Sequence, residues 1–393
     1  MRKAVLVDAV RTPMGRRNGK LKGIHPVDLA SIPLKALVER NDLDPGLVED
    51  VIMGCVMQTG EQGLNVGRNA ALAAGFPETV VGTTIDRQCG SSQQSAHFAA
   101  QGVMAGAYDD VIAAGIESMS RIPMGVTAMQ GPGQPFGDQM IERYDGNLVP
   151  QGISAQLIAE KWDISREEMD ELALQSHQRA ARATEEGRFE TQIIPIEVTL
   201  EDGTTEIMDR DEGIRPTTSM EKLAGLQPAF DPTHRITAGN SSQITDGSAA
   251  LLIMEESKAE ELGLKPMARF VSFSLAGADP ILMLTAPIPA TEKALDKAGL
   301  TIDDIDLFEI NEAFASVPIA WRLEHGGSDP KKLYERTNVN GGAVALGHPL
   351  GASGARLMTT LVHELVRSGG RYGLQSMCEG GGMANGTIIE AVA

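Results

Sequence analysis

Short apolar runs alternate along the chain with longer stretches in which apolar residues recur every three or four positions. The run "VVGTTID" predicts a buried strand, and the segment that follows "RQCGSS" predicts an amphipathic helix. The apolar stripe of that helix consists of Ala96, Ala99, Ala100, Val103 and Met104. Repeated alternation of this kind is typical of βαβ units with largely parallel, buried sheets, so the pattern predicts an α/β fold.

The chain also resembles itself. The segment "LKALVERNDLDPGLVEDVIMG" returns in outline as "EKALDKAGLTIDDIDLFEINEA", a helix followed by an acidic turn and a strand. Likewise "DDVIAAGIESM" pairs with "YGLQSMCEGGG", and "DGSAALLIMEES" pairs with "GMANGTIIEAV". Two copies of one α/β unit are the economical interpretation. Two unrelated α/β domains with generic patterning are the alternative.

The first copy is interrupted after "ESM" and resumes at "DGSAALL", and the residues between have no counterpart in the second copy. We therefore predict an N-terminal half at 1–119, completed by 246–265, an inserted loop domain at 120–245, and a C-terminal half at 266–393. Long insertions in compact domains usually carry function.

Composition narrows the class of protein. The net charge of -19 opposes nonspecific binding to nucleic acid or to anionic membranes, and no apolar stretch approaches the roughly 20 residues needed to span a bilayer. Three cysteines in 393 residues favour free thiols in a reducing compartment. The opening "MRKAVLVDAVRTP" lacks the features of a signal or transit peptide, so we expect a cytoplasmic protein. The histidines show no metal-ligand spacing, and no metal site is predicted.

Cys89 lies in the turn between the predicted strand and helix. A helix N-terminus offers free backbone amides and a partial positive charge, which stabilise a thiolate and can hold an anionic oxygen. Cys89 is therefore a candidate nucleophile, with a buried and inert cysteine as the alternative. In the second copy, "NVNGGAVALGHPLGASGAR" also runs from a turn into a helix and places His348 at the matching position. If the copies pack by pseudo-twofold symmetry, a general base would lie beside the nucleophile.

Two further segments carry candidate chemistry. Cys378 precedes three consecutive glycines in "MCEGGGMANG", where backbone amides could approach a ligand closely and form an oxyanion hole. Asn311 in "EINEAFA" follows a strand end, where its amide could hold a water or a carbonyl. Taken singly, Cys378 could be a core residue and Asn311 a helix cap.

Together these motifs resemble the thiolase family. The resemblance covers essentially the whole chain through "VDAVRTPMGR", "CGSS", "NEAFA", "NGGAVALGHPLGASGAR" and "CEGGGMANG". It implies a five-layered αβαβα core of two similar halves with an inserted loop domain. It also implies a homodimer or homotetramer and coenzyme A thioester chemistry, with coenzyme A as a substrate and no permanently bound cofactor.

Carried onto this chain, the resemblance implies that Cys89 attacks a 3-oxoacyl-CoA while His348 takes its proton. The oxygen of the leaving enolate would be held by His348 and by a water on Asn311, while Cys378 protonates its carbon. The backbone amides of Cys89 and Gly380 would stabilise the tetrahedral oxyanion.

For coenzyme A, the resemblance implies contacts from Arg215 in "DEGIRPTT" and Ser242 in "AGNSSQITDG", with Lys222 as a further candidate for the phosphates. A solvated arginine and a turn serine are the alternative interpretations.

Substrate preference is indicated by a departure from the family's pattern. Short-chain members commonly carry "HMG" where this chain has "PQG" at 150–152, and "DRQCGSSQQ" and "CEGGGMANG" look more like degradative members, including those of sterol catabolism. We therefore expect cleavage of 3-oxoacyl-CoA in fatty-acid or sterol side-chain β-oxidation. A biosynthetic acetoacetyl-CoA thiolase and a noncatalytic lipid-binding relative are the alternatives.

Overall fold

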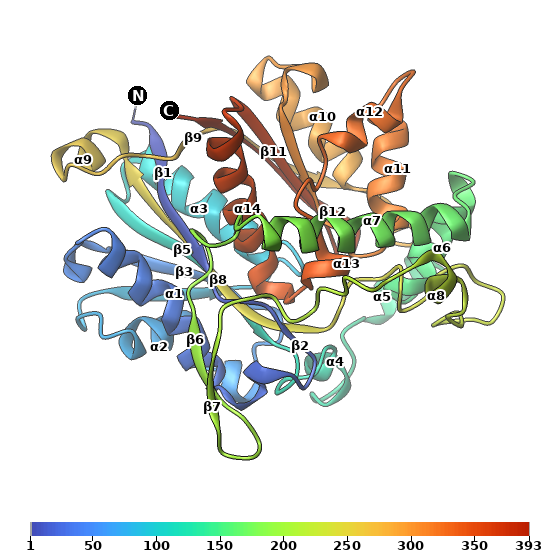
Figure 1. Cartoon of the computed structure of the whole chain (residues 1–393), viewed down its shortest axis with the longest axis horizontal. Helices are drawn as coiled ribbons and strands as arrows, with labels where there is room; N and C mark the ends of the chain where they lie inside the picture. The colour runs from blue at the N-terminus through green and yellow to red at the C-terminus, as the bar shows by residue number, and fades with distance from the viewer. Residues whose placement is uncertain (1, 393) are drawn as a thin grey trace.

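The computed structural model describes residues 2–392, and its first half lies on both sides of a long insertion (Figure 1). The elements of this half, with 3-10 helices labelled η, are β1 (Ala4–Arg11), β2 (Gly15–Arg16), η1 (Lys20–Gly23), α1 (Pro26–Arg40), η2 (Pro45–Leu47), β3 (Asp50–Gly54), η3 (Gly60–Gln62), α2 (Val66–Ala73), β4 (Val81–Ile85), α3 (Ser91–Ala105), β5 (Asp110–Ser118), β8 (Thr245–Glu255) and α9 (Glu256–Glu261). The strands join in the order β4-β3-β5-β8-β1, in which β3 is parallel to β4 and β5 while β8 is antiparallel to β5 and β1.

The second half repeats this order of elements. It comprises β9 (Ala268–Gly277), α10 (Pro287–Ala298), η4 (Ile302–Asp304), β10 (Leu307–Ile310), α11 (Ser316–His325), α12 (Pro330–Glu335), α13 (Ala343–Leu346), η5 (Leu350–Ala352), α14 (Ser353–Ser368), β11 (Tyr372–Glu379) and β12 (Met383–Ala391). Its strands join in the order β10-β11-β12-β9, and β9 meets β1 through the pairs Val5–Arg269 and Leu6–Ala268. A parallel bridge between Phe308 and Thr337 takes the place that β4 has beside β3.

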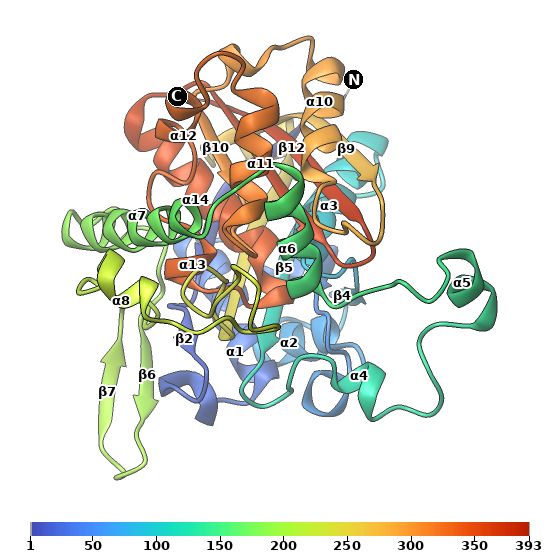
Figure 2. The ribbon, with the colours of Figure 1, turned by 90° about the vertical axis from the view of Figure 1, so that its right-hand side faces the viewer.

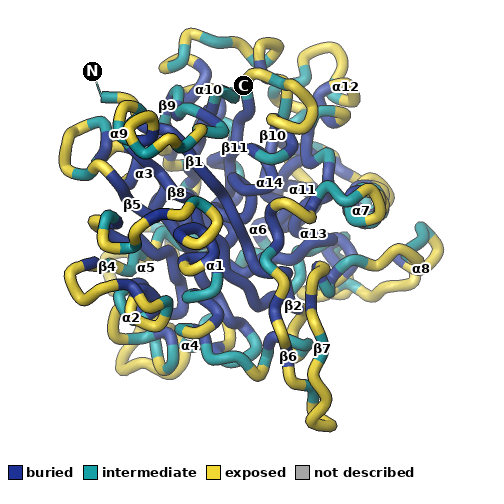
Figure 3. Tube along the Cα trace, turned by 60° about the vertical axis from the view of Figure 1, so that its left-hand side comes forward, coloured by how far each residue is buried: buried dark blue, intermediate teal, exposed yellow. Residues whose placement is uncertain are grey.

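Three apolar clusters hold these elements together as five layers, and the middle cluster joins both half-sheets to the helices between them. Helices α1 and α2 cover the outer face of the first half-sheet, α3 and α14 lie between the two half-sheets, and α10 and α11 cover the outer face of the second (Figure 1). Strand β1 is buried on both faces, because Val5 packs toward α1 while Leu6 packs toward α3 and α14. The central strands accordingly form the buried centre of the molecule (Figure 3). The predicted layered α/β fold with two duplicated halves is confirmed.

The insertion lies between β5 and β8. It contains α4 (Val126–Met129), α5 (Asp138–Arg143), α6 (Gln151–Lys161), α7 (Arg166–Glu185), β6 (Ile196–Thr199), β7 (Thr205–Met208) and α8 (Met220–Ala224). The longest helix, α7, begins with a capping box in which the Ser165 and Glu168 side chains bond each other's backbone amides. The segment carrying α4 and α5 extends away from the core, as does the β6–β7 hairpin (Figure 2).

Membrane-spanning helices and metal-ligand groups are both missing from residues 2–392. None of the helices there combines the length and apolarity required to cross a membrane. Nor do His, Cys, Asp and Glu side chains of this region gather in a group of three that could hold a metal ion.

Candidate active site

The turn between β4 and α3 places Cys89 at the N-terminal end of α3. Gln88 adopts a left-handed backbone with φ of 47°, and Gly90 directly precedes the helix. The Ser91 hydroxyl fixes the turn, because it accepts the Arg87 amide at 2.9 Å and donates to the Gln88 carbonyl at 2.6 Å. The local sequence therefore holds the thiol beside the first amides of α3.

The N-terminus of α14 meets the N-terminus of α3. The Ala355 amide donates to the Ser92 hydroxyl at 2.9 Å, and a Cβ atom added at Gly354 would lie 2.2 Å from the Gln93 backbone nitrogen. Glycine at position 354 thus permits the close approach of the two helices. The convergence predicted from the duplication is confirmed, and it brings the turn of His348 to the same end of the core as the turn of Cys89.

The hydrogen bonds of His348 define which ring nitrogen can accept a proton. Its Nδ1 bonds the Ser353 hydroxyl, whose own proton goes to the Pro349 carbonyl at 2.8 Å. Nδ1 must therefore be the protonated nitrogen, and Nε2 accepts from the Asn311 side-chain amide at 3.4 Å. Burial, together with the positive charge of Arg356, lowers the pKa of His348 to about 3. The ring is a neutral base at physiological pH.

Cys378 and Gly380 lie at the end of β11, next to these groups. The backbone amide of Asn311 donates to the Ser376 carbonyl at 3.1 Å, which joins Asn311 to the strand that carries Cys378. Gly380 faces the nucleophile's turn, because a Cβ atom added there would lie 3.0 Å from Gln88 Oε1. Burial raises the pKa of Cys378 well above its ordinary value, and the neighbouring Cys89 and Glu379 raise it further.

The surroundings of Cys89 favour the neutral thiol. Burial and the nearby Glu379 raise its pKa to about 12, although the backbone amides of Cys89 and Gly380 and the side chain of Gln151 act in the opposite direction. The amides at the helix N-terminus thus favour the thiolate, as the sequence predicts, but desolvation of the thiol has the larger effect. A neutral thiol beside a neutral imidazole can still react by transferring its proton during attack.

Apolar side chains enclose the thiol. Cys89 packs with Met57, Met119, Ile122 and Leu350, while Cys378 belongs to a neighbouring apolar cluster that includes Phe314. The motif "PQG", which replaces the "HMG" of short-chain members, forms the start of α6, with Pro150 as N-cap and Gln151 half-buried. The Phe230 ring lies over Gly152, where an added Cβ atom would meet it at 2.2 Å.

The three candidate coenzyme A contacts fall in two places. Ser242 is half-buried and its amide donates to the Ala313 carbonyl at 2.9 Å, two residues beyond Asn311. Arg215 is exposed on the loop before α8, and Lys222 is exposed within α8, where its ammonium donates to the Thr217 carbonyl at 2.6 Å. Ser242 is thus close to the candidate catalytic residues, and the two cations lie on the surface of the inserted segment.

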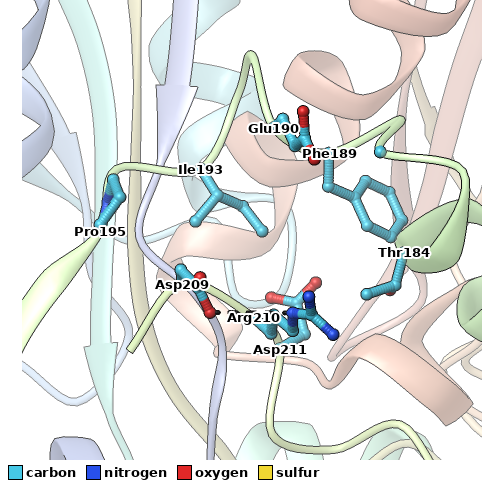
Figure 4. Close-up of a pocket in the computed structure, with 9 residues that line it drawn as sticks. Thr184, Phe189, Glu190, Ile193, Pro195, Asp209, Arg210 and Asp211 are labelled. Atoms are coloured by element: carbon cyan, nitrogen blue, oxygen red, sulfur yellow. Dashed lines mark ion pairs between the residues drawn. The ribbon is translucent and has the colours of Figure 1, made fainter. Parts of the chain in front are cut away.

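Two cavities lie apart from these residues. One, of about 310 Å³, is bordered by Phe189, Ile193 and Asp211 (Figure 4). Its carboxylate Asp211 is buried and paired with Arg11 at 2.6 Å, so the pair fixes the wall of that cavity. The other, of about 440 Å³, lies beside α12 and His325.

Sequence reasoning missed two residues at this end of the core. Gln151 faces the Cys89 thiol, although the motif "PQG" suggested only a difference in the acyl pocket. Glu117 accepts the Gly351 amide at 2.9 Å and so links β5 to the turn that carries His348. The paired segments "DDVIAAGIESM" and "YGLQSMCEGGG" contained the signal, since each carries a glutamate near the end of its strand.

Comparison with known proteins identifies the family. Residues 4–257 match the family described as "Thiolase, N-terminal domain", and residues 264–391 match "Thiolase, C-terminal domain". The chain belongs to the thiolase family. This thiolase is an acyltransferase by family, and the predicted resemblance is confirmed.

Individual relatives refine the comparison. The steroid 3-ketoacyl-CoA thiolase FadA6 of Mycobacterium tuberculosis is 50% identical over 99% of this thiolase and 94% of its own length. The 3-ketoacyl-CoA thiolase of Photobacterium profundum is 45% identical over the full length of both chains. The crystal structure of the Bacillus anthracis acetyl-CoA acetyltransferase matches with a TM-score of 0.90 and 41% identity, over 100% of this chain and 99% of that one.

Proposed function

We propose that this thiolase cleaves 3-oxoacyl-CoA with coenzyme A, giving acetyl-CoA and a shortened acyl-CoA through an acyl-Cys89 intermediate. The observation that carries the proposal is the meeting of the α3 and α14 N-termini, which brings the turns of Cys89 and His348 together beside Cys378. The names of relatives at 43–50% identity support the degradative direction.

In the first half-reaction, Cys89 Sγ attacks the 3-keto carbon while His348 Nε2 takes the thiol proton. The C2–C3 bond then breaks, and its electron pair leaves as the enolate of acetyl-CoA. The imidazolium and a water held by Asn311 stabilise the enolate oxygen, and Cys378 gives its proton to C2. Asn311 Oδ1 suits this role, since it is buried and accepts no hydrogen bond from residues 2–392.

In the second half-reaction, the Cys378 thiolate takes the proton of an incoming coenzyme A thiol. The coenzyme A sulfur attacks the acyl carbon on Cys89, and the amides of Cys89 and Gly380 hold the oxyanion. The intermediate collapses, Cys89 leaves, and it recovers its proton from His348. Every proton and electron pair is provided by these residues and the two substrates, so the proposal includes no resident cofactor.

Two alternative functions receive less support. A biosynthetic acetoacetyl-CoA thiolase would agree with the name of the structural relative, which is less similar in sequence than FadA6. A noncatalytic lipid-binding relative would not need the set Cys89, Asn311, His348 and Cys378, all of which this chain retains.

The acyl group provides the test of the proposed function. We expect kcat/KM for medium-chain or ring-bearing 3-oxoacyl-CoA to exceed that for acetoacetyl-CoA, because each enclosed methylene contributes roughly 1–3 kcal/mol of discrimination. Thiolysis rates for such a series, at one pH and a fixed coenzyme A concentration, measure the preference. A tenfold or larger advantage for acetoacetyl-CoA would support the biosynthetic alternative instead.

We also propose that the inserted segment, residues 120–245, binds coenzyme A, with Ser242 at the inner end of its path and Arg215 and Lys222 at the phosphates. A polyanionic substrate needs a local cation on a chain whose net charge is -19. Ser242 is a suitable inner contact because its backbone is held beside the strand end that carries Asn311.

Arg215→Ala should raise the KM for coenzyme A by about three- to tenfold with a smaller fall in kcat, because a remote phosphate contact is similar in ground and transition states. The effect should shrink as salt screens the charge. Arg210→Ala, an exposed arginine of the same segment, is the matched control. An Arg215→Ala enzyme with unchanged KM at low and high ionic strength would argue against this site.

The assembly proposed is a homodimer or homotetramer in the cytoplasm, with no nucleic-acid or membrane partner. Strand β4 supports self-association, because it is the last strand of its half-sheet and Val81 on it is 55% exposed. Thiol chemistry at Cys89 and Cys378 supports a reducing compartment.

A further inference from the structure

Corresponding strands of the two halves carry a buried glutamate at the last or the penultimate residue. In the first half, Glu117 on β5 pairs with Gly247 on β8, and in the second half, Glu379 on β11 pairs with Met383 on β12. Gly247 and Met383 hold the same position in the repeated strands β8 and β12. Both glutamates are 0% exposed, so the duplication places two equivalent carboxyl groups inside the core.

Glu117 is surrounded by donors. Its carboxyl accepts the amides of Val56 at 2.9 Å, Met57 at 3.2 Å and Gly351 at 2.9 Å, and the Gln62 side chain at 2.7 Å. These bonds satisfy a carboxylate and tie the first half to the turn of His348 in the second half. Glu117 is therefore a structural link between the halves.

Glu379 belongs to the second half and contacts the turn of Cys89 in the first half, but its carboxyl group lacks such donors. Neither of its carboxyl oxygens has a hydrogen-bond partner within the described residues. A Cβ atom added at Gly90 would lie 2.0 Å from Glu379 Oε1, so the carboxyl packs directly on the residue that follows Cys89. Glu379 also precedes Gly380 in the chain. It thus adjoins both backbone segments whose amides are proposed to hold the oxyanion.

The surroundings of Glu379 contain few charges. The loop before α3 contributes Arg87 and Asp86. The Asp86 carboxylate accepts a hydrogen bond from the Gln88 backbone amide. The thiols of Cys89 and Cys378 both respond to the charge of Glu379. On β12, the facing residues 383–385 are uncharged. Burial raises the pKa of Glu379 to about 8, although Arg87 and the backbone amide of Asn385 act in the opposite direction.

We propose that Glu379 is a positioning residue that must hold its proton during turnover, an inference that rests on the proposed thiolase function. Attack by Cys89, departure of the enolate and formation of the tetrahedral intermediate each create negative charge beside this carboxyl. The neutral acid supports the turn of Cys89 through its packing on Gly90. The ionised form, which lacks the ring of donors that surrounds Glu117, repels each of these anions and so slows the reaction.

The pH dependence of Glu379→Gln tests this role. Wild-type kcat/KM for 3-oxoacyl-CoA should fall above pH about 8, while the Glu379→Gln enzyme, which resembles the neutral acid, should equal wild type within about threefold at pH 7. Its alkaline decline should begin at least about one pH unit higher. Asp110→Asn removes another buried carboxyl, at the far end of β5, whose pKa burial raises to about 6. This control should leave the alkaline limb unchanged.

A second variant changes the charge beside the Glu379 carboxyl and leaves Glu379 itself in place. Arg87→Gln removes the cation that lowers the pKa of Glu379, so the alkaline limb should move to higher pH while Glu379 itself is retained. This variant keeps the proposal testable if Glu379→Gln does not fold. A limb that moves with neither variant overturns the proposal, as does a folded Glu379→Gln enzyme that is inactive at pH 7.

Alkylation of Cys89 separates this inference from the proposed function, because it requires no turnover. Iodoacetamide is applied across a pH series and the modified peptide is quantified by mass spectrometry. Loss of the Glu379 charge should lower the apparent pKa of the Cys89 thiol in Glu379→Gln relative to wild type. This shift would persist even if the enzyme cleaved no 3-oxoacyl-CoA. An unchanged alkylation profile would contradict the inference while leaving the thiolase function intact.

Discussion

Cys89→Ser should reduce thiolysis of 3-oxoacyl-CoA by about 10⁴-fold or more. A serine hydroxyl at this buried position has no accessible anion and is a much weaker nucleophile, so acylation cannot proceed even with His348 in place. Single-turnover rates with saturating substrate measure the loss directly. Cys55→Ser makes the same atomic change at another buried thiol and should retain near-wild-type activity.

The identity of the acylated residue provides a check that does not depend on rates. Wild-type enzyme incubated with 3-oxoacyl-CoA in the absence of free coenzyme A, then quenched in acid, should carry the acyl group on the peptide containing Cys89. An adduct found solely on Cys378 or Cys55 would refute the assignment of the nucleophile.

His348→Asn should reduce the rate of acylation by about 10²- to 10⁴-fold, because the general base that receives the Cys89 proton is lost. Asparagine keeps a polar group near Asn311 but cannot take up a proton. The KM for coenzyme A should change little. A pre-steady-state burst of acetyl-CoA, measured by rapid quench, isolates this step. His25→Asn replaces one N-cap of α1 with another and is the control.

The same histidine predicts the acid side of the pH profile. The pKa of His348 is lowered to about 3, so the ring remains a neutral base as pH falls through the ordinary histidine range. Wild-type kcat/KM should therefore show no loss near pH 6.5 that is attributable to this residue. A decline near pH 6.5 that disappears in His348→Asn would contradict the neutral resting state of the imidazole. Retention of more than a tenth of wild-type activity by His348→Asn would contradict its role as general base.

The sequence predicted the duplication because each half must bury the same strand and helix faces, and that requirement is visible as repeated apolar patterns. It also predicted the meeting of the two turns, since equivalent helices of a pseudo-twofold pair share one end. It could not predict how strongly burial raises the pKa of Cys89, which depends on how completely distant segments desolvate the thiol. Nor could it predict that Glu117 would be fully hydrogen-bonded and Glu379 left without donors, because their partners come from loops whose paths are not repeated.

The position of the insertion has a consequence for biosynthesis. Strand β1 reaches the rest of its half-sheet through β8, because the order is β5-β8-β1, and β8 follows the entire inserted segment. On the ribosome, β3, β4 and β5 emerge early with an unpaired edge, and they wait for Thr245–Glu255 to be translated before β1 can join them. Such a long-range pairing is slow to form and leaves an aggregation-prone edge exposed during synthesis. The nascent chain of this protein should therefore depend on chaperones until β8 emerges.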